Sequence, residues 1–236
     1  MLLRSLVFYM GLISTMMLMV PFSLLIFPFP FAKRYYFATR WTAFNLWWLK
    51  ITCDLTHSIE GLENIPTNAS IIMSKHQSAW ETLAIQLIFP IQVWIVKREL
   101  LWIPVYGWGL ASMQPITIDR SSAIKAFRKI EKQGCERLAK GYWVVIFPEG
   151  TRVAPGQTKK YLPGGGMLAK KSGVSIIPVA HNAGYFWPRN SITKKSGTIQ
   201  MVIGPAIDPD GKTAIEITNE VEKWIEDTVN KLPKPD

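Results

Sequence analysis

Two short segments of this 236-residue chain combine side chains that can move a proton and hold an anion. The first is KHQSAWE, residues 75–81, in which His76 and Glu81 are five positions apart. Histidine titrates near neutral pH, and a carboxylate that accepts its Nδ1 proton leaves Nε2 free to accept a proton from a hydroxyl group. The segment therefore predicts a general base at His76 with Glu81 as its partner.

The local structure decides whether this pair can meet. Five positions along a continuous α-helix turn the chain by about 500°, which leaves the two side chains about 140° apart. The pair requires His76 to lie in a turn between a strand at 70–74 and a helix at 79–89. A structural alternative stays open, in which Ser78 and Glu81 form the reciprocal cap of that helix.

The second segment is FPEGTR, residues 147–152, which directly follows the most apolar predicted strand. Pro148 and Gly150 predict a turn that aims Glu149 and Arg152 outward. The planar guanidinium group of arginine suits phosphate oxygens, and glycine lets a ligand approach the backbone. Taken alone, the segment is equally consistent with a solvated turn.

Other cations are candidates for the same anion site. Arg120 follows a predicted strand in the segment ITIDR, where an ordinary ion pair or helix cap with Asp119 is the alternative. Lys97 and Lys75 are weaker candidates for the phosphate or for a thioester oxyanion. A basic and aromatic loop indicates either contact with anionic lipid or an ordinary exposed loop; its residues are Phe186, Trp187, Arg189, Lys194 and Lys195.

Charge and motif content exclude several classes of function. The net charge is +10, and residues 75–195 carry 18 Lys and Arg against 6 Asp and Glu, which indicates an anionic partner for the middle of the chain. The sequence has no phosphate-binding GxxxxGK[ST] loop and no GxSxG segment, and its three histidines lack metal-ligand spacing. We therefore expect neither a cofactor nor a metal. The two cysteines, without CxxC spacing, favour a reducing compartment.

The elements that must position these residues follow an α/β pattern. Short apolar runs alternate with longer amphipathic ones, which predicts a mixed sheet with flanking helices over residues 55–236. The predicted strands are 70–74, 92–96, 115–118, 142–147, 175–179 and 198–203. The predicted helices, besides 79–89, are 121–140 and 213–231.

Residues 1–54 are predicted to form two membrane-embedded or interfacial helices. Between Arg4 and Lys33 the chain has 28 residues without a charge. Pro21 interrupts this stretch, so the first helix either kinks and continues across the bilayer or dips into one leaflet and returns. Tryptophan, tyrosine and basic residues alternate over 33–50, which favours a second helix at headgroup depth. Packing of both helices on the rest of the protein, with no membrane contact, is the alternative.

The ordered segments around His76, Arg120, FPEGTR and residues 177–180 resemble the glycerolipid acyltransferase superfamily. The similarity is greatest to 1-acyl-sn-glycerol-3-phosphate acyltransferases and covers about residues 55–205. FPEGTR is a specific signature, whereas the histidine block is specific only together with it. The family usually has Asn-His-x4-Asp in that block, so Lys75 and Glu81 depart from the pattern.

This resemblance implies a reaction and a set of roles. His76 is implied as the general base with Glu81, while Arg120, Glu149, Gly150, Thr151 and Arg152 are implied as contacts of the glycerol phosphate. The expected substrates are lysophosphatidic acid and an acyl thioester of CoA or acyl-carrier protein, and the expected product is phosphatidic acid. The expected location is a membrane, with the active site facing the cytosol and no nucleic acid as partner.

Two alternatives remain open from the sequence. The first keeps the reaction and changes the acceptor to glycerol-3-phosphate or another lysophospholipid. The second is a non-catalytic, membrane-attached binder of anionic lipid or nucleic acid. That second alternative explains the basic charge but not the presence of FPEGTR beside the histidine block.

Overall fold

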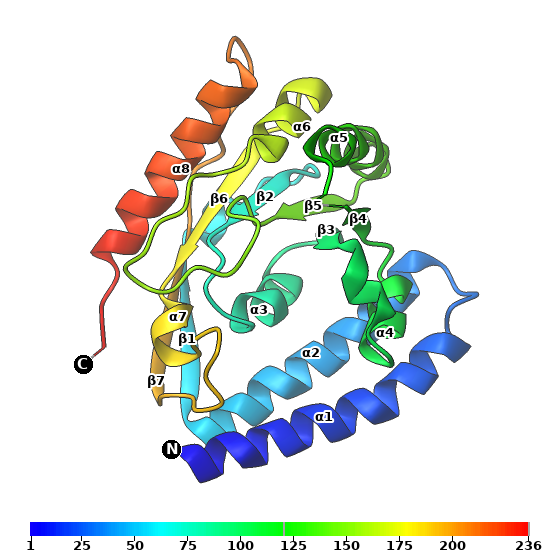
Figure 1. Ribbon diagram of the computed structural model, residues 1–236, viewed down its shortest axis with the longest axis vertical. Coiled ribbons are helices and arrows are strands. Elements are labelled where there is room, and N and C mark those ends of the chain that lie inside the picture. Colours follow the sequence, from blue (N-terminus) through cyan, green and yellow to red (C-terminus); the bar gives the residue numbers. More distant parts are fainter. Residues whose placement is uncertain (120, 236) are drawn as a thin grey trace.

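The computed structural model describes residues 1–119 and 121–235, which form one sheet with helices on both of its faces (Figure 1). The elements, in chain order, are α1 (Leu2–Leu25), α2 (Phe31–Cys53), β1 (Leu55–Glu60), η1 (Leu62–Asn64), β2 (Ile71–Ser74), α3 (Trp80–Ile88), β3 (Gln92–Lys97), η2 (Arg98–Trp102), α4 (Tyr106–Ser112), β4 (Ile116–Ile118), α5 (Ala123–Ala139), β5 (Trp143–Ile146), α6 (Gly164–Ser172), β6 (Ile176–His181), α7 (Ala183–Phe186), β7 (Gly197–Ile203) and α8 (Ala214–Lys231).

The sheet has the strand order β1-β7-β6-β2-β5-β3-β4. Strands β2 to β6 run parallel, β7 is antiparallel to β6, and β1 is parallel to β7. Ile72 at the centre pairs with Val145 on one side and Ile177 on the other. The predicted α/β fold with a mixed sheet is therefore confirmed.

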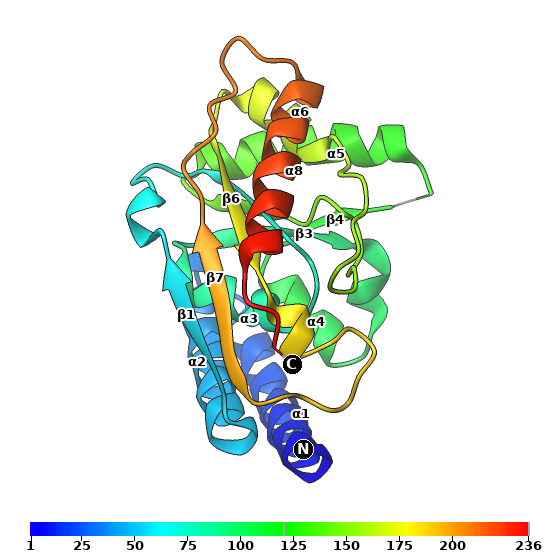
Figure 2. The ribbon, with the colours of Figure 1, turned by 90° about the vertical axis from the view of Figure 1, so that its left-hand side faces the viewer.

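Alternate residues of the central strands fill two separate cores. Ile71 and Val144 face a core built with α5, α6 and α8, whereas Ile72 and Val145 face a core built with α1, α2 and α3. Figure 2 shows α8 in front of the sheet on the first face, with α1 and α2 on the other side. Since both faces are covered, the central strands are apolar throughout, which made them recognisable in the sequence.

All six predicted strands are present, with ends shifted by no more than two residues. The sequence did not predict β1 or the helices α4, α6 and α7. Helix α6 begins with three glycines, which have low helix propensity, but Gly165 lies so close to Met73 and Gly166 so close to Ala214 that a side chain has no room there. Tertiary packing outweighs local propensity in this helix.

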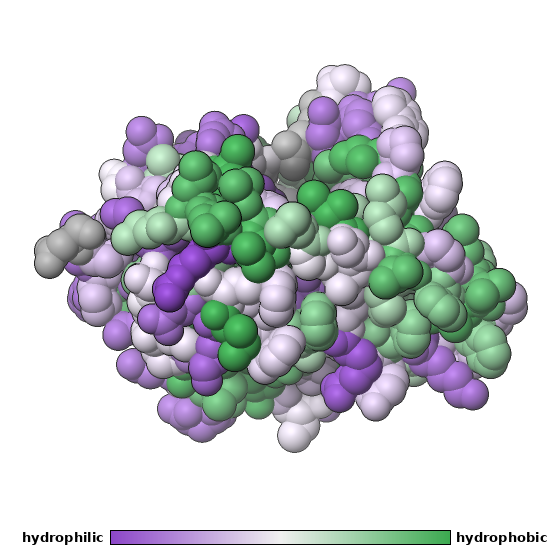
Figure 3. Space-filling view, turned by 90° about the horizontal axis from the view of Figure 1, so that it is seen from below, coloured by the Kyte–Doolittle hydropathy of each residue, from purple (hydrophilic) through white to green (hydrophobic). Residues whose placement is uncertain are grey.

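Helices α1 and α2 form an antiparallel hairpin beneath the sheet (Figure 1). Helix α1 continues past Pro21 to Leu25, so proline does not end it. Its segment Leu2–Phe22 is, among the described residues, the one that is long and apolar enough to cross a membrane. Viewed from below, hydrophobic side chains gather where α1 lies and again toward the turn that joins it to α2 (Figure 3).

The beginning of α1 is fixed to the α/β body by Lys194. The Lys194 ammonium group lies 3.5 Å from the ring centroid of Tyr9, 4.5 Å from that of Trp187 and 4.7 Å from that of Phe8. Such cation–π contacts are stabilising when the cation is withdrawn from water. Phe186, Trp187 and Lys194 of the predicted basic and aromatic loop are buried, whereas Arg189 and Lys195 of the same loop are exposed.

Candidate active site

The candidate site lies at the carboxyl ends of four neighbouring strands. Strand β2 leads into residues 75–78, β5 into 147–152, β3 ends at Lys97 and β4 leads to Asp119. Parallel strands bring their carboxyl ends to one edge of a sheet, where α/β proteins place their ligands. Arg120 lies outside the described residues.

The His76 imidazole is held by Glu81, as the sequence predicted. His76 lies in the turn between β2 and α3, and its Nδ1 is 2.8 Å from Oε1 of Glu81. A carboxylate only accepts hydrogen bonds, so Nδ1 carries the proton and Nε2 is left as the basic atom. The ring also stacks on Phe147, with centroids 3.9 Å apart and planes at 11°. The hydrogen bond to Glu81 fixes one edge of the imidazole ring, and the stacking on Phe147 fixes the plane of the ring.

The same carboxylate also binds the start of α3. Oε1 of Glu81 accepts hydrogen bonds from the amides of Gln77 and Ser78, at 3.0 and 2.8 Å. The Ser78 hydroxyl accepts from the amide of Trp80, not from that of Glu81, so the reciprocal cap is only half formed. The Glu81 carboxylate therefore binds both the His76 imidazole and the backbone amides that precede α3.

Glu81 stays ionised because donors surround it. Burial alone raises the pKa of Glu81, but the positive potential of His181 and His76 and the donated hydrogen bonds together hold that pKa below its ordinary value. His181 is itself fully buried, and burial lowers its pKa. Nε2 of His181 donates to the carbonyl of Lys75 at 2.9 Å, while Nδ1 accepts from the amide of Ala183. This second histidine was not recognised in the sequence.

Glu149 and Lys75 point into the protein, contrary to expectation. Glu149 is fully buried, with Oε2 accepting the backbone amide of His76 at 2.7 Å and Oε1 paired with Lys75 Nζ at 2.8 Å. Burial raises the pKa of Glu149 to about 7, with Lys75 and the His76 amide acting in the opposite direction. The prediction that the turn aims Glu149 outward is wrong, and Lys75 is too enclosed to meet a substrate.

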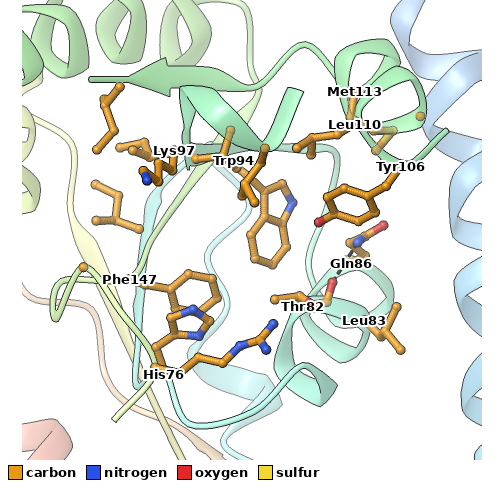
Figure 4. A pocket seen from close by; sticks show the side chains of 18 of the residues that line it. His76, Thr82, Leu83, Gln86, Trp94, Lys97, Tyr106, Leu110, Met113 and Phe147 are labelled. Atoms are coloured by element: carbon orange, nitrogen blue, oxygen red, sulfur yellow. Dashed lines mark hydrogen bonds between the residues drawn. The ribbon is translucent and has the colours of Figure 1, made fainter. Parts of the chain in front are cut away.

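A cavity of about 610 Å³ opens beside the imidazole. His76 and Arg152 both line it, together with Lys97, Gly150 and Thr151, so the structure brings these predicted residues together. Figure 4 shows His76 and Phe147 on one side and Trp94 and Lys97 across from them. Apolar residues of α1 and α5 extend the wall, among them Met16, Met19, Val20, Ala126 and Phe127. The arrangement places one base and several cations at a cavity whose lining is mainly apolar.

Sequence reasoning missed other residues of this cavity. Lys159 adds a cation to its lining, and nothing in the surrounding sequence marks it. Phe147, by contrast, is the first residue of FPEGTR, so its position in the motif was a usable signal. Gly150 has φ of 68°, a backbone conformation that favours glycine and closes the turn before Arg152.

Comparison with known proteins agrees with this geometry. The sequence model of the acyltransferase family matches residues 56–182. The 1-acyl-sn-glycerol-3-phosphate acyltransferase of Pseudomonas aeruginosa is 41% identical over 97% of this chain and 91% of its own length. This chain belongs to the acyltransferase family. Its match to the corresponding enzyme of Borreliella burgdorferi, 33% identical, covers 64% of the chain and 61% of that relative.

A solved acyltransferase has the same fold. The crystal structure of the 1-acyl-sn-glycerophosphate (LPA) acyltransferase of Thermotoga maritima aligns with a TM-score of 0.79 and 25% identity, covering 98% of this chain and 95% of that one.

Proposed function

We propose that this acyltransferase transfers a fatty acyl group to the sn-2 hydroxyl of 1-acyl-sn-glycerol 3-phosphate, giving phosphatidic acid. The observation that carries the proposal is the His76–Glu81 pair opening into the same cavity as Arg152. The pair supplies a base for an alcohol, and the arginine supplies a cation for a phosphate. The activity printed for the P. aeruginosa relative supports the same assignment.

The reaction proceeds by direct transfer, without an acyl-enzyme. Nε2 of His76 accepts the hydroxyl proton as the hydroxyl oxygen attacks the carbonyl carbon of the thioester. The resulting tetrahedral intermediate collapses, the C–S bond breaks, and the imidazolium returns its proton to the departing thiolate. Glu81 keeps the imidazole in the correct tautomer and stabilises the imidazolium while it exists.

The acceptor phosphate binds among the cations of the cavity. Arg152 presents a planar fork for two phosphate oxygens, and Lys97 and Thr151 line the same space. Gly150 lets the ligand approach the backbone of the turn. The side chains of Glu149 and Lys75 do not contact the phosphate in this proposal, since both are buried.

The hairpin of α1 and α2 holds residues 55–236 at a membrane, with the site open toward the cytosol. Exposed apolar side chains on one stripe of α1 support this placement, namely Leu3, Leu6, Met10, Ile13 and Met17. Anionic lipid is attracted by the basic middle of the chain. The acyl thioester, whether of CoA or of an acyl-carrier protein, then arrives from the aqueous side.

A competition assay tests the function. The purified chain in lipid vesicles receives labelled acyl-CoA, with lysophosphatidic acid and glycerol-3-phosphate as competing acceptors, and the products are separated. Labelled phosphatidic acid as the main product supports the proposal. Labelled lysophosphatidic acid as the main product, or no acylated product with either CoA or carrier-protein donors, contradicts it.

A further inference from the structure

A buried ion network connects the C-terminal helix α8 to the backbone of His76. Nζ of Lys75 lies 2.8 Å from Oε1 of Glu149 and 2.7 Å from Oε1 of Glu226, which is on α8. The Tyr161 hydroxyl donates to that same Glu226 oxygen at 2.9 Å. Lys75 and Glu149 are fully buried, and the Glu226 side chain is 15% exposed.

This network acts on the main chain of the base. Oε2 of Glu149 accepts the His76 amide at 2.7 Å, and the amide of Val153 donates to the His76 carbonyl at 2.8 Å. Both polar groups of the His76 peptide backbone are therefore held by residues 149–153. Lys75 fixes the Glu149 carboxylate, and Glu226 fixes Lys75.

Helix α8 has no direct access to the reaction chamber. Among the described residues, none from Ala214 to Lys231 lines the cavity. Its apolar face packs on the sheet through Ile217, Val221 and Ile225. Burying a charge is unfavourable unless the charge is paired, so a lysine with two carboxylates in this interior indicates a role beyond packing.

We propose that Lys75 and Glu226 are positioning residues that set the placement of His76 through Glu149, so that α8 controls turnover from outside the cavity. Their removal lowers kcat and leaves the acceptor KM nearly unchanged, because no substrate contact is lost. The inference rests on the proposed function, since turnover is its readout.

The network predicts a specific non-additivity. Lys75→Met removes the cation that orients the Glu149 carboxylate and leaves it beside the charge of Glu226, so that Glu149 takes up a proton and accepts the His76 amide more weakly. Glu226→Gln keeps the shape of the side chain and removes one charge. In the double variant the neighbouring charge of Glu226 is absent, so Glu149 is disturbed less and the variant should be more active than Lys75→Met alone.

The experiment measures kcat and KM for lysophosphatidic acid with the full-length chain in vesicles. We expect kcat to fall about 10- to 100-fold in Lys75→Met and about 3- to 10-fold in Glu226→Gln, with KM within about two-fold. The double variant should match Glu226→Gln. Matched controls are Lys212→Met and Glu220→Gln, which break an exposed ion pair of 2.6 Å next to and on α8 and should leave kcat unchanged.

Three results would overturn the positioning role. The first is wild-type kcat in folded Glu226→Gln protein, and the second is a rise in KM that accounts for the loss of activity. The third is a double variant whose loss of kcat equals the product of the two single losses. If Lys75→Met does not fold, the single Glu226→Gln variant and its Glu220→Gln control still decide it. Absence of phosphatidic acid from the wild-type chain instead overturns the proposed function, and this inference with it.

Discussion

In the proposed reaction, Nε2 of His76 is the atom that accepts the hydroxyl proton. Replacing His76 with alanine removes the base while the Glu81 carboxylate keeps its contacts with the amides of Gln77 and Ser78. Loss of a general base typically reduces turnover by about 10²- to 10⁴-fold. We expect that loss in kcat, measured at saturating substrates, with a thermal unfolding curve close to that of the wild type. Wild-type turnover would remove His76 from the mechanism.

The pKa of Glu81 makes stability depend on pH. Because folding lowers the pKa of Glu81 below its ordinary value of 4.5, this group stabilises the folded state above about pH 4.5, and the stabilisation is lost as the pH falls toward the folded pKa. Glu81→Gln should therefore be less stable than the wild type at pH 7, and the difference should shrink below pH 4.5. Thermal unfolding across this range measures it, and a constant difference would count against the assignment.

Arg152 is expected to act on substrate binding more than on the proton transfer. Arg152→Lys keeps the charge but loses the planar fork, so KM for lysophosphatidic acid should rise about 10-fold with a smaller change in kcat. Arg189→Lys is a suitable control, since Arg189 donates to the backbone carbonyl of Arg152 from an exposed position. A lower kcat at unchanged KM in Arg152→Lys would show that the arginine serves the reaction step instead.

The sequence was enough to predict the hydrogen-bonded pair of His76 and Glu81, but not the direction in which the Glu149 side chain points. The spacing of His76 and Glu81 and the strand before them were enough to predict a hydrogen bond in the turn. The inward direction of Glu149 could not be predicted, because its partners, the Lys75 ammonium group and the His76 amide, lie far away in the sequence. Contacts between distant segments also explain why His181 and Lys159 were missed.

At the scale of elements, the glycines of α6 determine how closely two helices approach. A Cβ atom at Gly166 would lie 2.2 Å from the carbonyl oxygen of Ala214 and 2.5 Å from Oγ1 of Thr218. Gly166→Ala should therefore destabilise the protein by about 3 kcal/mol, because backbone has to move. Chemical denaturation measures this free energy of unfolding. Lys170→Ala, exposed on the same helix, is the control and should differ little from the wild type.

The elements that were predicted correctly are those with strong local patterns. Strand β5 is a continuous apolar run, and α8 has both an amphipathic pattern and a full capping box between Thr213 and Glu216. Strand β1 escaped prediction because, among the described residues, it pairs with β7 alone, 142 positions along the chain, and half of its residues are exposed. The glycine-rich start of α6 is helical only because of its neighbours.

At the scale of the whole molecule, the proposed membrane attachment depends on the exposed stripe of α1. Met10 and Met17 are 61% and 53% exposed on that stripe. A charged residue inside the bilayer costs about 3 kcal/mol by insertion scales, so Met10→Glu combined with Met17→Glu should release the protein from lipid vesicles in a flotation assay. The control Ile215→Glu, on α8, should still float with the vesicles. Equal flotation of both variants would contradict attachment through α1.

Helix α1 also contributes Met16, Met19 and Val20 to the wall beside His76. A shortened form of the protein starting after residue 30 would retain every residue of the two sequence motifs. It would nevertheless lack the wall of the cavity that α1 supplies, and water would enter the cavity from that side. In this acyltransferase, the helix proposed to attach the protein to the membrane also lines the cavity, so its removal is expected to disrupt the candidate site.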